Sequence, residues 1–241
     1  MIRHFQMILF MGLFLSFLAP SLKAQKDSMK NELNETNDWP NLRRYRSENA
    51  QLKPEKDRVV FMGNSITDIW LNVSPQFFKT HPSYIDRGIS GQTTPQMLIR
   101  FRQDVIDLKP KVVIILAGIN DIAGNTGPSS LDMIENNLAS MAQLAKANGI
   151  KVILSSVLPA NTIPWRRGIE PAQKIIDLNK WIKDFARKNK FIYLDYYSAM
   201  ADERKGLPAK YSKDGVHPAA EGFAVMEPLA VKAISLALKE K

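Results

Sequence analysis

Residues 111–118 read KVVIILAG, an apolar run of branched aliphatic side chains that stops at a glycine. A strand with one face in water alternates apolar and polar residues, whereas this run is apolar on both faces. Such strands lie inside parallel sheets that helices cover on both sides. The stretch therefore predicts an α/β fold built around a buried parallel sheet.

Segments of the same kind recur on either side of this run, each rich in β-branched or aromatic residues. These further predicted strands cover residues 58–62, 83–86, 150–157 and 190–194. Apolar residues with the 3.6-residue period of a helix recur over residues 94–108, 129–149, 171–185 and 223–233. We expect Thr94 to cap the first helix, and Ser129 with Asp132 to cap the second. Alternation of strand and helix predicts a five-stranded parallel sheet with helices on both faces.

The composition fits one globular α/β domain, since 45% of the 241 residues are hydrophobic and 24% are charged. The formal net charge is +9, but basic and acidic residues interleave and no basic run exceeds a pair. This pattern predicts a solvated, mildly basic surface and no nucleic-acid partner. The chain has no cysteine, which excludes disulfides, a thiol nucleophile and thiolate metal ligands.

Residues 1–24 have the pattern of a secretory signal peptide. Arg3 begins a short polar region, residues 5–19 are almost wholly apolar, and a cleavage site precedes Gln25. The apolar region is shorter than the ~20 residues that span a bilayer, so we expect cleavage and no stable membrane insertion afterwards. Export without disulfides predicts a secreted or periplasmic bacterial protein.

Residues 25–56 are polar and lack a strand pattern, and we expect a leader with a short helix. The domain proper is predicted to span residues 57–241. The side chains expected to pack this leader onto the domain are Trp39, Leu42, Tyr45 and Leu52.

Four short segments combine small residues with reactive polar ones, and three of them directly follow predicted strands. They are GNSITD at 63–68, RGISG at 87–91, GIND at 118–121 and DGVHP at 214–218. In a sheet of order 2-1-3-4-5, strands 1 and 3 are neighbours at the switch point where ligands bind. We therefore expect these polar side chains to meet at the carboxyl edge of the sheet.

These residue types suit acyl transfer, which needs a nucleophile, a base, a group that orients the base and donors for an oxyanion. Ser65 supplies a hydroxyl and His217 an imidazole. Asp214, three residues before His217, can accept from its Nδ1 if the segment turns. Gly91 can bring its N–H close to a substrate because it lacks a Cβ, and Asn120 adds an uncharged amide donor.

The four segments resemble the four signature blocks of the SGNH hydrolases, also called GDSL-like lipases and acylhydrolases. The resemblance covers residues 57–241, with the blocks in the family's order. The sequence as a whole is similar to exported esterases of Bacteroidetes-type bacteria. The resemblance implies a flavodoxin-like three-layer fold and no cofactor. We also expect no metal site, because only two histidines follow the signal segment and they are 136 positions apart. The triad that the resemblance implies is Ser65 as nucleophile, His217 as base and Asp214 as the group that orients the base. The implied oxyanion donors are the N–H groups of Ser65 and Gly91 and the side chain of Asn120.

One position departs from the family pattern, since Asn64 replaces the usual Asp of Gly-Asp-Ser. Asparagine keeps the shape and hydrogen-bonding capacity but loses the charge. Motifs of other enzyme designs (G-x-S-x-G, H-E-x-x-H, the P-loop and G-x-G-x-x-G) do not occur in the sequence. We expect His81 to be structural, Asp121 to brace its loop, and Asp68 and Asp195 to cap helices.

An exported esterase meets polysaccharides outside the cell, so we predict removal of acetyl or another short acyl group from carbohydrates. Trp165 is the expected sugar platform, with Arg166 or Arg167 reaching an acidic group. The alternatives are a lysophospholipase or thioesterase, a glycan acyltransferase, and a non-catalytic glycan-binding protein. The sequence leaves the acyl chain length and the oligomeric state open.

Overall fold

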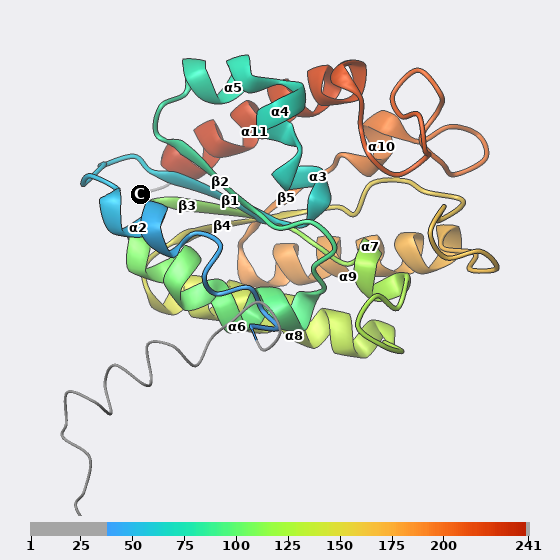
Figure 1. The fold of residues 1–241 in the computed structure, drawn as a ribbon, viewed down its shortest axis with the longest axis horizontal. Coiled ribbons are helices and arrows are strands. Elements are labelled where there is room, and N and C mark those ends of the chain that lie inside the picture. Colours follow the sequence, from blue (N-terminus) through green and yellow to red (C-terminus); the bar gives the residue numbers. More distant parts are fainter. Residues whose placement is uncertain (1–37, 240–241) are drawn as a thin grey trace, which may run out of the picture. The chain divides into compact units, whose positions relative to one another are not determined.

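The structure, a computed structural model, describes residues 38–239 and has a five-stranded parallel sheet at its centre (Figure 1). The strand order is β2-β1-β3-β4-β5, so the predicted α/β fold and its order are confirmed. The strands are β1 (Val59–Gly63), β2 (Tyr84–Gly88), β3 (Val112–Leu116), β4 (Lys151–Ser155) and β5 (Ile192–Leu194). All pairs are parallel, so the carboxyl ends of the strands share one edge.

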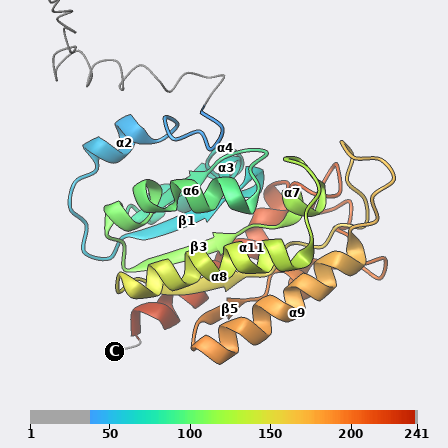
Figure 2. The ribbon, with the colours of Figure 1, turned by 90° about the horizontal axis from the view of Figure 1, so that it is seen from below.

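Helices cover both faces of the sheet. Those on one face, side by side in Figure 2, are α6 (Thr94–Asp104), α8 (Leu131–Ala147) and α9 (Ala172–Asn189). The opposite face carries α3 (Ser65–Asp68), α4 (Trp70–Val73), α5 (Pro75–Thr80) and α11 (Ala220–Lys239). The remaining short elements are α2 (Arg46–Gln51), a 3-10 helix (Ile106–Leu108), α7 (Ile119–Ile122) and α10 (Tyr197–Met200).

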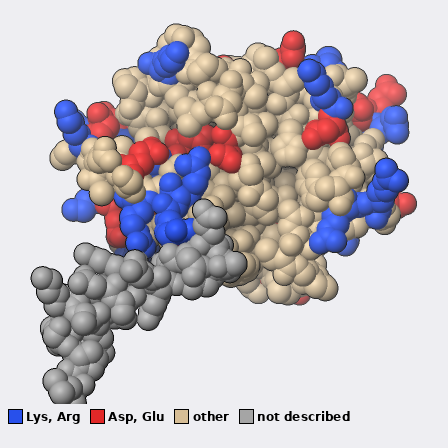
Figure 3. Space-filling model, viewed as in Figure 1, with Lys and Arg blue, Asp and Glu red and all other residues tan. Residues whose placement is uncertain are grey.

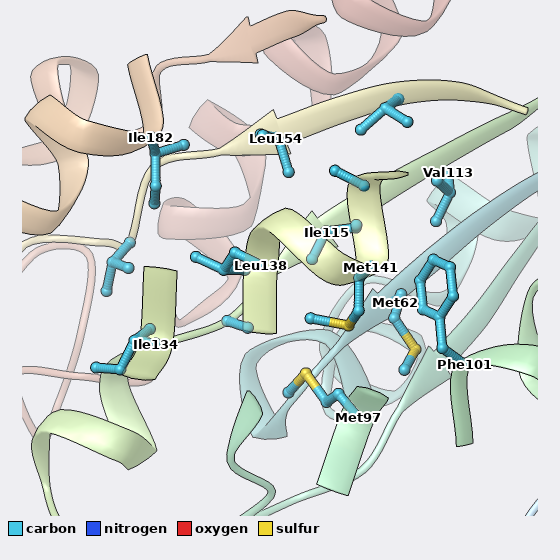
Figure 4. Close-up of a cluster of buried hydrophobic side chains, with 14 of the residues drawn as sticks. Met62, Met97, Phe101, Val113, Ile115, Ile134, Leu138, Met141, Leu154 and Ile182 are labelled. Atoms are coloured by element: carbon cyan, nitrogen blue, oxygen red, sulfur yellow. The ribbon is translucent and has the colours of Figure 1, made fainter. Parts of the chain in front are cut away.

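Successive strand residues point to opposite faces, which divides the core into two apolar clusters. Met62 packs with Met97 of α6 and Met141 of α8 on one side (Figure 4). Phe61 packs against Trp70 and its neighbours on the other side, with ring centroids 5.6 Å apart. Full burial of a side chain of this size contributes roughly 1.5–3 kcal/mol, so both helix layers are held by similar forces.

Two helix caps fall one residue away from their predicted positions. Thr93, not Thr94, forms the capping box of α6 with Gln96, and Ser130, not Ser129, accepts from the N–H of the third residue of α8. Each pair offers two adjacent hydroxyl residues with the same capping chemistry. Local sequence cannot choose between them, because the choice depends on where the helix meets the rest of the fold.

Residues 38–56 belong to the same compact unit as the sheet. Tyr45 is buried and its hydroxyl donates to the Gly88 carbonyl at the end of β2. Asn49 donates to Asp104 of α6 (2.8 Å). Trp39, which we expected to pack on the domain, is instead 50% exposed. Polar contacts therefore hold this segment against β2 and α6, together with the packing of Leu52 on the core.

The predicted signal peptide at residues 1–24, and residues 25–37 of the leader, lie outside the described residues. Within residues 38–239, none of the helices is long and apolar enough to cross a membrane. Figure 3 shows acidic and basic side chains together on one face, mostly around its rim. That arrangement agrees with the interleaved charges of the sequence.

Candidate active site

The turn between β1 and α3 carries Ser65. Asn64 precedes α3, and its Oδ1 accepts from the backbone N–H of Ile66 (3.0 Å). The amide oxygen therefore caps this helix without the carboxylate that the family pattern has at this position. A Cβ on Gly88 would lie 2.1 Å from the backbone nitrogen of Asp68, so glycine is required for α3 to pack this closely on β2.

Ser65, His217 and Asp214 form one series of hydrogen bonds. Ser65 Oγ lies 2.8 Å from His217 Nε2, and His217 Nδ1 lies 2.7 Å from Asp214 Oδ2. Because an ionised carboxylate can only accept, Nδ1 carries the proton, and Nε2 of a neutral imidazole accepts from the serine hydroxyl. An imidazole held in this tautomer can take the hydroxyl proton when the oxygen attacks an electrophile.

The turn at residues 212–217 fixes the carboxylate of Asp214. Its Oδ1 accepts from the N–H groups of Val216 (2.9 Å) and His217 (2.8 Å). Partial burial alone would raise the pKa of Asp214, but the hydrogen bonds from His217 and Val216 outweigh burial and lower that pKa to about 2. The carboxylate is therefore ionised at neutral pH, as an acceptor for Nδ1 must be.

Gly91 and Asn120 lie beside Ser65. Gly91 is on the loop that follows β2, and Asn120 is in α7, the short helix that follows β3. Gly91 has a φ of +79°, a conformation that favours glycine. Asn120 is buried, and its Nδ2 donates to the carbonyl of Gln92 (2.9 Å). An amide nitrogen carries two hydrogens, and this bond uses one of them. The segments after three strands thus converge on one place, as the topology predicts.

These residues line a pocket of about 450 Å³ at the carboxyl edge of the sheet. Its lining residues are Ser65, Ile69, Ser90, Gly91, Asn120, Asn125, Trp165 and His217. The indole of Trp165 is 40% exposed and lies 5.7 Å from the imidazole of His217. Arg166 instead donates to the Gly124 carbonyl (2.7 Å), and neither it nor Arg167 lines the pocket.

Three lining residues, Ile69, Ser90 and Asn125, were not among the residues predicted from the sequence. Ile69 follows the 63–68 segment directly, and Ser90 lies within the 87–91 segment. Asn125 lies four residues after the 118–121 segment. Their proximity to the motifs was the available signal, but chain position alone does not show which side chains face the pocket.

Two aspartates hold the loops around the pocket. Asp68, predicted to cap a helix, instead accepts from the N–H (3.0 Å) and hydroxyl (2.5 Å) of Ser90. Its carboxylate faces the β2–α6 loop, because α3 packs against the end of β2. Asp121 accepts from the N–H and hydroxyl of Thr94, so it ties the loop after β3 to α6. Burial raises the pKa of Asp121 to about 6 against the opposing hydrogen bonds.

The other predicted polar residues lie away from this pocket. His81 Nδ1 bonds to the Phe77 carbonyl (2.8 Å), and its ring stacks on Tyr84, which is a structural role. Asp195 accepts from the N–H of Ser198 in the first turn of α10 (3.0 Å). Within the described part of the chain, no group of three His, Asp or Glu side chains is arranged to hold a metal ion.

Arg100 is a wholly buried charge that was not among the residues predicted from the sequence. Its guanidinium donates to the carbonyls of Gly63 (3.0 Å), the last residue of β1, and Arg87 (2.9 Å), the last but one of β2. It also donates to Gln92 Oε1 (2.5 Å) and pairs with Asp104 (3.1 Å). One side chain of α6 thereby joins the strand ends from which the Ser65 and Gly91 loops depart.

A flavodoxin-like sheet with a Ser–His–Asp series at its carboxyl edge defines a class of protein, the serine hydrolases of this three-layer α/β fold. More particularly, this chain belongs to the GDSL-like lipase/acylhydrolase family, whose family model matches residues 61–225. That family is described as lipases and acylhydrolases, and two of the curated relatives are named as esterases.

Three relatives illustrate the range of the similarity. A GDSL-like lipase from Bacteroides thetaiotaomicron, known from a crystal structure, is 53% identical in sequence. The match covers 82% of this chain and 98% of that one, with a TM-score of 0.80. Esterase TesA of Pseudomonas aeruginosa is 30% identical over 56% of this chain and 61% of its own length. Acetylxylan esterase of Geobacillus stearothermophilus is 28% identical over 59% of this chain and 67% of its own length. The matches thus span about half to two thirds of the curated relatives' lengths.

Proposed function

We propose that Ser65 is the nucleophile of a two-step ester hydrolysis. Ser65 Oγ attacks the ester carbonyl carbon while His217 Nε2 takes its proton, and Asp214 stabilises the resulting imidazolium. His217 then returns the proton to the leaving alcohol, and the acyl group remains on Ser65. Water attacks this acyl-enzyme with His217 again as base, which releases the carboxylic acid and restores the serine.

The negative oxygen of each tetrahedral intermediate is stabilised by three donors. These are the backbone N–H groups of Ser65 and Gly91 and the side-chain amide of Asn120, all of which border the pocket. Fixed donors of this kind stabilise the developing charge strongly because they need no reorganisation during the reaction.

The substrate that we propose is a carbohydrate carrying acetyl or another short acyl group. The observation that carries this proposal is the position of Trp165. His217 must lie next to the leaving oxygen to protonate it, so an indole 5.7 Å from the imidazole lies beside the leaving alcohol. An exposed indole offers an apolar face on which a sugar ring can stack, and one relative is an acetylxylan esterase.

The first test compares the wild-type protein, Ser65→Ala and Ser140→Ala on p-nitrophenyl acetate. Ser140 is the matched control, since its hydroxyl donates only to the Asn136 carbonyl on α8. We expect Ser65→Ala to lower kcat by a factor on the order of 10³ or more and Ser140→Ala to leave it unchanged. Equal activity of all three proteins would show that Ser65 is not the nucleophile.

The acyl preference is tested with p-nitrophenyl acetate against the decanoate, and with acetylated xylooligosaccharides as natural-type esters. We expect the acetate to react faster than the decanoate and acetic acid to be released from the oligosaccharide. Much faster hydrolysis of the decanoate would contradict the short-acyl proposal and favour a lipase or thioesterase. Acylated sugar in place of free acetic acid, detected by mass spectrometry, would instead indicate acyl transfer.

We also propose that residues 1–24 are removed on export. The basis is the sequence pattern of a polar start, an apolar stretch and the Leu22-Lys23-Ala24 site. The intact mass of the protein recovered from a bacterial periplasm or medium should equal that of a chain beginning at Gln25. Recovery of full-length chain in the membrane fraction would contradict cleavage.

A further inference from the structure

Asn125 contacts both loop residues that we place in the oxyanion hole, and it also contacts the sugar platform. Its backbone N–H donates to the carbonyl of Asn120 (3.0 Å). Its side-chain Nδ2 donates to the carbonyl of Gly91 (3.3 Å), and its Oδ1 accepts from the Trp165 indole N–H (3.0 Å). These bonds connect the loops that follow β2, β3 and β4.

The chemistry of the partners determines how the Asn125 amide is oriented. An indole N–H can only donate and the Gly91 carbonyl can only accept. The amide therefore has one orientation that satisfies both partners, with its oxygen toward Trp165 and its nitrogen toward Gly91. If either partner were lost, the amide would no longer be held in that orientation.

The turn that carries Asn125 is itself held from two sides. Arg166, next to Trp165 in the chain, donates to the Gly124 carbonyl (2.7 Å). On the other side, the hydroxyls of Thr126 and Thr93 lie 2.9 Å apart. These two contacts restrain the residues on either side of Asn125, whereas its side chain is held by Gly91 and Trp165.

Gly91 needs such restraint because its backbone has few steric limits. It lacks a Cβ, its φ is positive, and nothing lies within 4 Å of where a Cβ would be. Asp68 holds the preceding residue, Ser90, through its N–H and hydroxyl. The Asn125 bond to the Gly91 carbonyl holds the following peptide, so the two contacts fix the Gly91 N–H from both directions.

We infer that Asn125 is a positioning residue for the oxyanion hole, and that Trp165 sets the orientation of the Asn125 amide. This inference rests on the proposed function. It extends that function because the residue that receives the leaving sugar also aligns the Gly91 donor. A sugar stacked on the indole restrains Trp165, and through Asn125 it restrains Gly91. Leaving-group binding therefore raises kcat and does not only lower KM.

Two variants separate the two hydrogen bonds, and the first of them keeps the shape of the side chain. Asn125→Asp keeps an acceptor for the Trp165 N–H but places a carboxylate oxygen against the Gly91 carbonyl. Trp165→Phe keeps an aromatic face but removes the N–H. The matched control is Trp39→Phe, since Trp39 is a half-exposed tryptophan that does not line the pocket.

The variants are assayed on ethyl acetate, whose alcohol is too small to cover the indole. Loss of a whole oxyanion donor lowers kcat about 10²–10³-fold, and misalignment should cost less. We expect about a tenfold lower kcat for Asn125→Asp and a several-fold lower kcat for Trp165→Phe, with KM nearly unchanged. The double variant Trp165→Phe/Asn125→Asp should be no slower than Asn125→Asp alone, because both changes break one connection. Trp39→Phe should match wild type.

Inhibition by a trifluoromethyl ketone provides a readout that a loss of folding would not mimic. Its tetrahedral adduct with serine places a negative oxygen in the oxyanion hole, so its affinity should fall in parallel with kcat while the melting temperature stays unchanged.

If Trp165→Phe kept the full kcat on ethyl acetate and only raised KM for acetylated sugars, Trp165 would contact the sugar without orienting Asn125. That result would overturn the inferred role of Trp165. Full kcat of Asn125→Asp would overturn the positioning role. Both results leave the proposed function intact, because wild type remains active and Ser65→Ala inactive. A wild-type protein inert on every ester would overturn the proposed function and this inference with it.

Discussion

Asp214 directs its two carboxylate oxygens to different tasks. Oδ1 holds the turn through backbone N–H groups, and Oδ2 accepts from His217 Nδ1. The three-residue spacing allows this pairing if the segment turns, and the family resemblance implies it. The structure adds the reason that the spacing suffices, which is that the same carboxylate folds the turn that brings the imidazole back to it.

We predict that Asp214→Asn lowers kcat on p-nitrophenyl acetate by a factor on the order of 10³–10⁴, with a small change in KM. The amide has the same shape but can present N–H groups to Nδ1, which favours the wrong imidazole tautomer. Steady-state kinetics measure the effect, with the melting temperature as the control for folding. Near-normal turnover would mean that His217 does not need this carboxylate as its acceptor.

Asp86 on β2 is a buried carboxyl group that catalysis does not use. Its Oδ1 accepts from the Gly88 N–H (2.6 Å), and burial raises its pKa to about 7, with Asp68 adding to the rise. A carboxyl group with a higher pKa in the folded state stabilises the fold while it is protonated. This contribution is complete below about pH 4 and is lost as the pH rises through about 7.

We therefore predict that the stability of the wild type falls between pH 5 and pH 8, and that Asp86→Asn reduces this fall. The asparagine oxygen still accepts from the Gly88 N–H but does not titrate. Melting temperatures of both proteins at the two pH values give the slopes. Burial also raises the pKa of Asp121, to about 6. Asp86→Asn should therefore retain part of the fall in melting temperature with pH. Equal slopes for the two proteins would contradict the assignment to Asp86.

At the scale of elements, α6 is the helix that joins the site to the sheet. Arg100 projects from it to carbonyls at the ends of β1 and β2, and Asp104, one turn later, neutralises its charge. Sequence periodicity predicted one helix over residues 94–108, whereas α6 ends at Asp104 and a 3-10 helix covers Ile106–Leu108. It could not reveal Arg100, because a charged residue in a helix is normally assigned to the solvated face.

We predict that Arg100→Met destabilises the protein by about 3–5 kcal/mol, because Asp104 would remain buried without its partner. The control is Arg102→Met on the exposed side of the same helix, which should change stability by less than ~0.5 kcal/mol. Urea unfolding of the three proteins measures both values. A cost below about 1 kcal/mol would show that the buried pair contributes little beyond its volume.

The short helices α3, α4 and α5 were not predicted from the sequence. Each has only four to six residues, which is too short for a helical period to appear above chance. The long helices and the strands were predicted because each carries a full apolar face or run. Sequence therefore predicted the framework, while the elements that connect Ser65 to β2 depend on tertiary packing.

For the molecule as a whole, sequence predicted which segments meet at the pocket, since Ser65, Gly91 and Asn120 follow strands that the topology makes neighbours. It did not predict Asn125 or the Asp68–Ser90 contact, which depend on loop conformations. The boundary at residue 57 stays a prediction, and residues from Asp38 onward form one compact unit with the sheet. Polar contacts such as Tyr45 to Gly88 leave no periodic trace in a sequence.

The two apolar clusters lie on the faces of the sheet, whereas the pocket lies at its carboxyl edge, lined by residues that follow β1, β2, β3 and β4 and by His217. For protein engineering, this separation means that the turn at residues 124–127 and the Trp165 loop can be diversified together as a library. The variants should keep their expression yield and cooperative melting while their ester preference changes. These two loops can thus be exchanged without changing the core, provided that Asn125 or another donor still bonds to the Gly91 carbonyl.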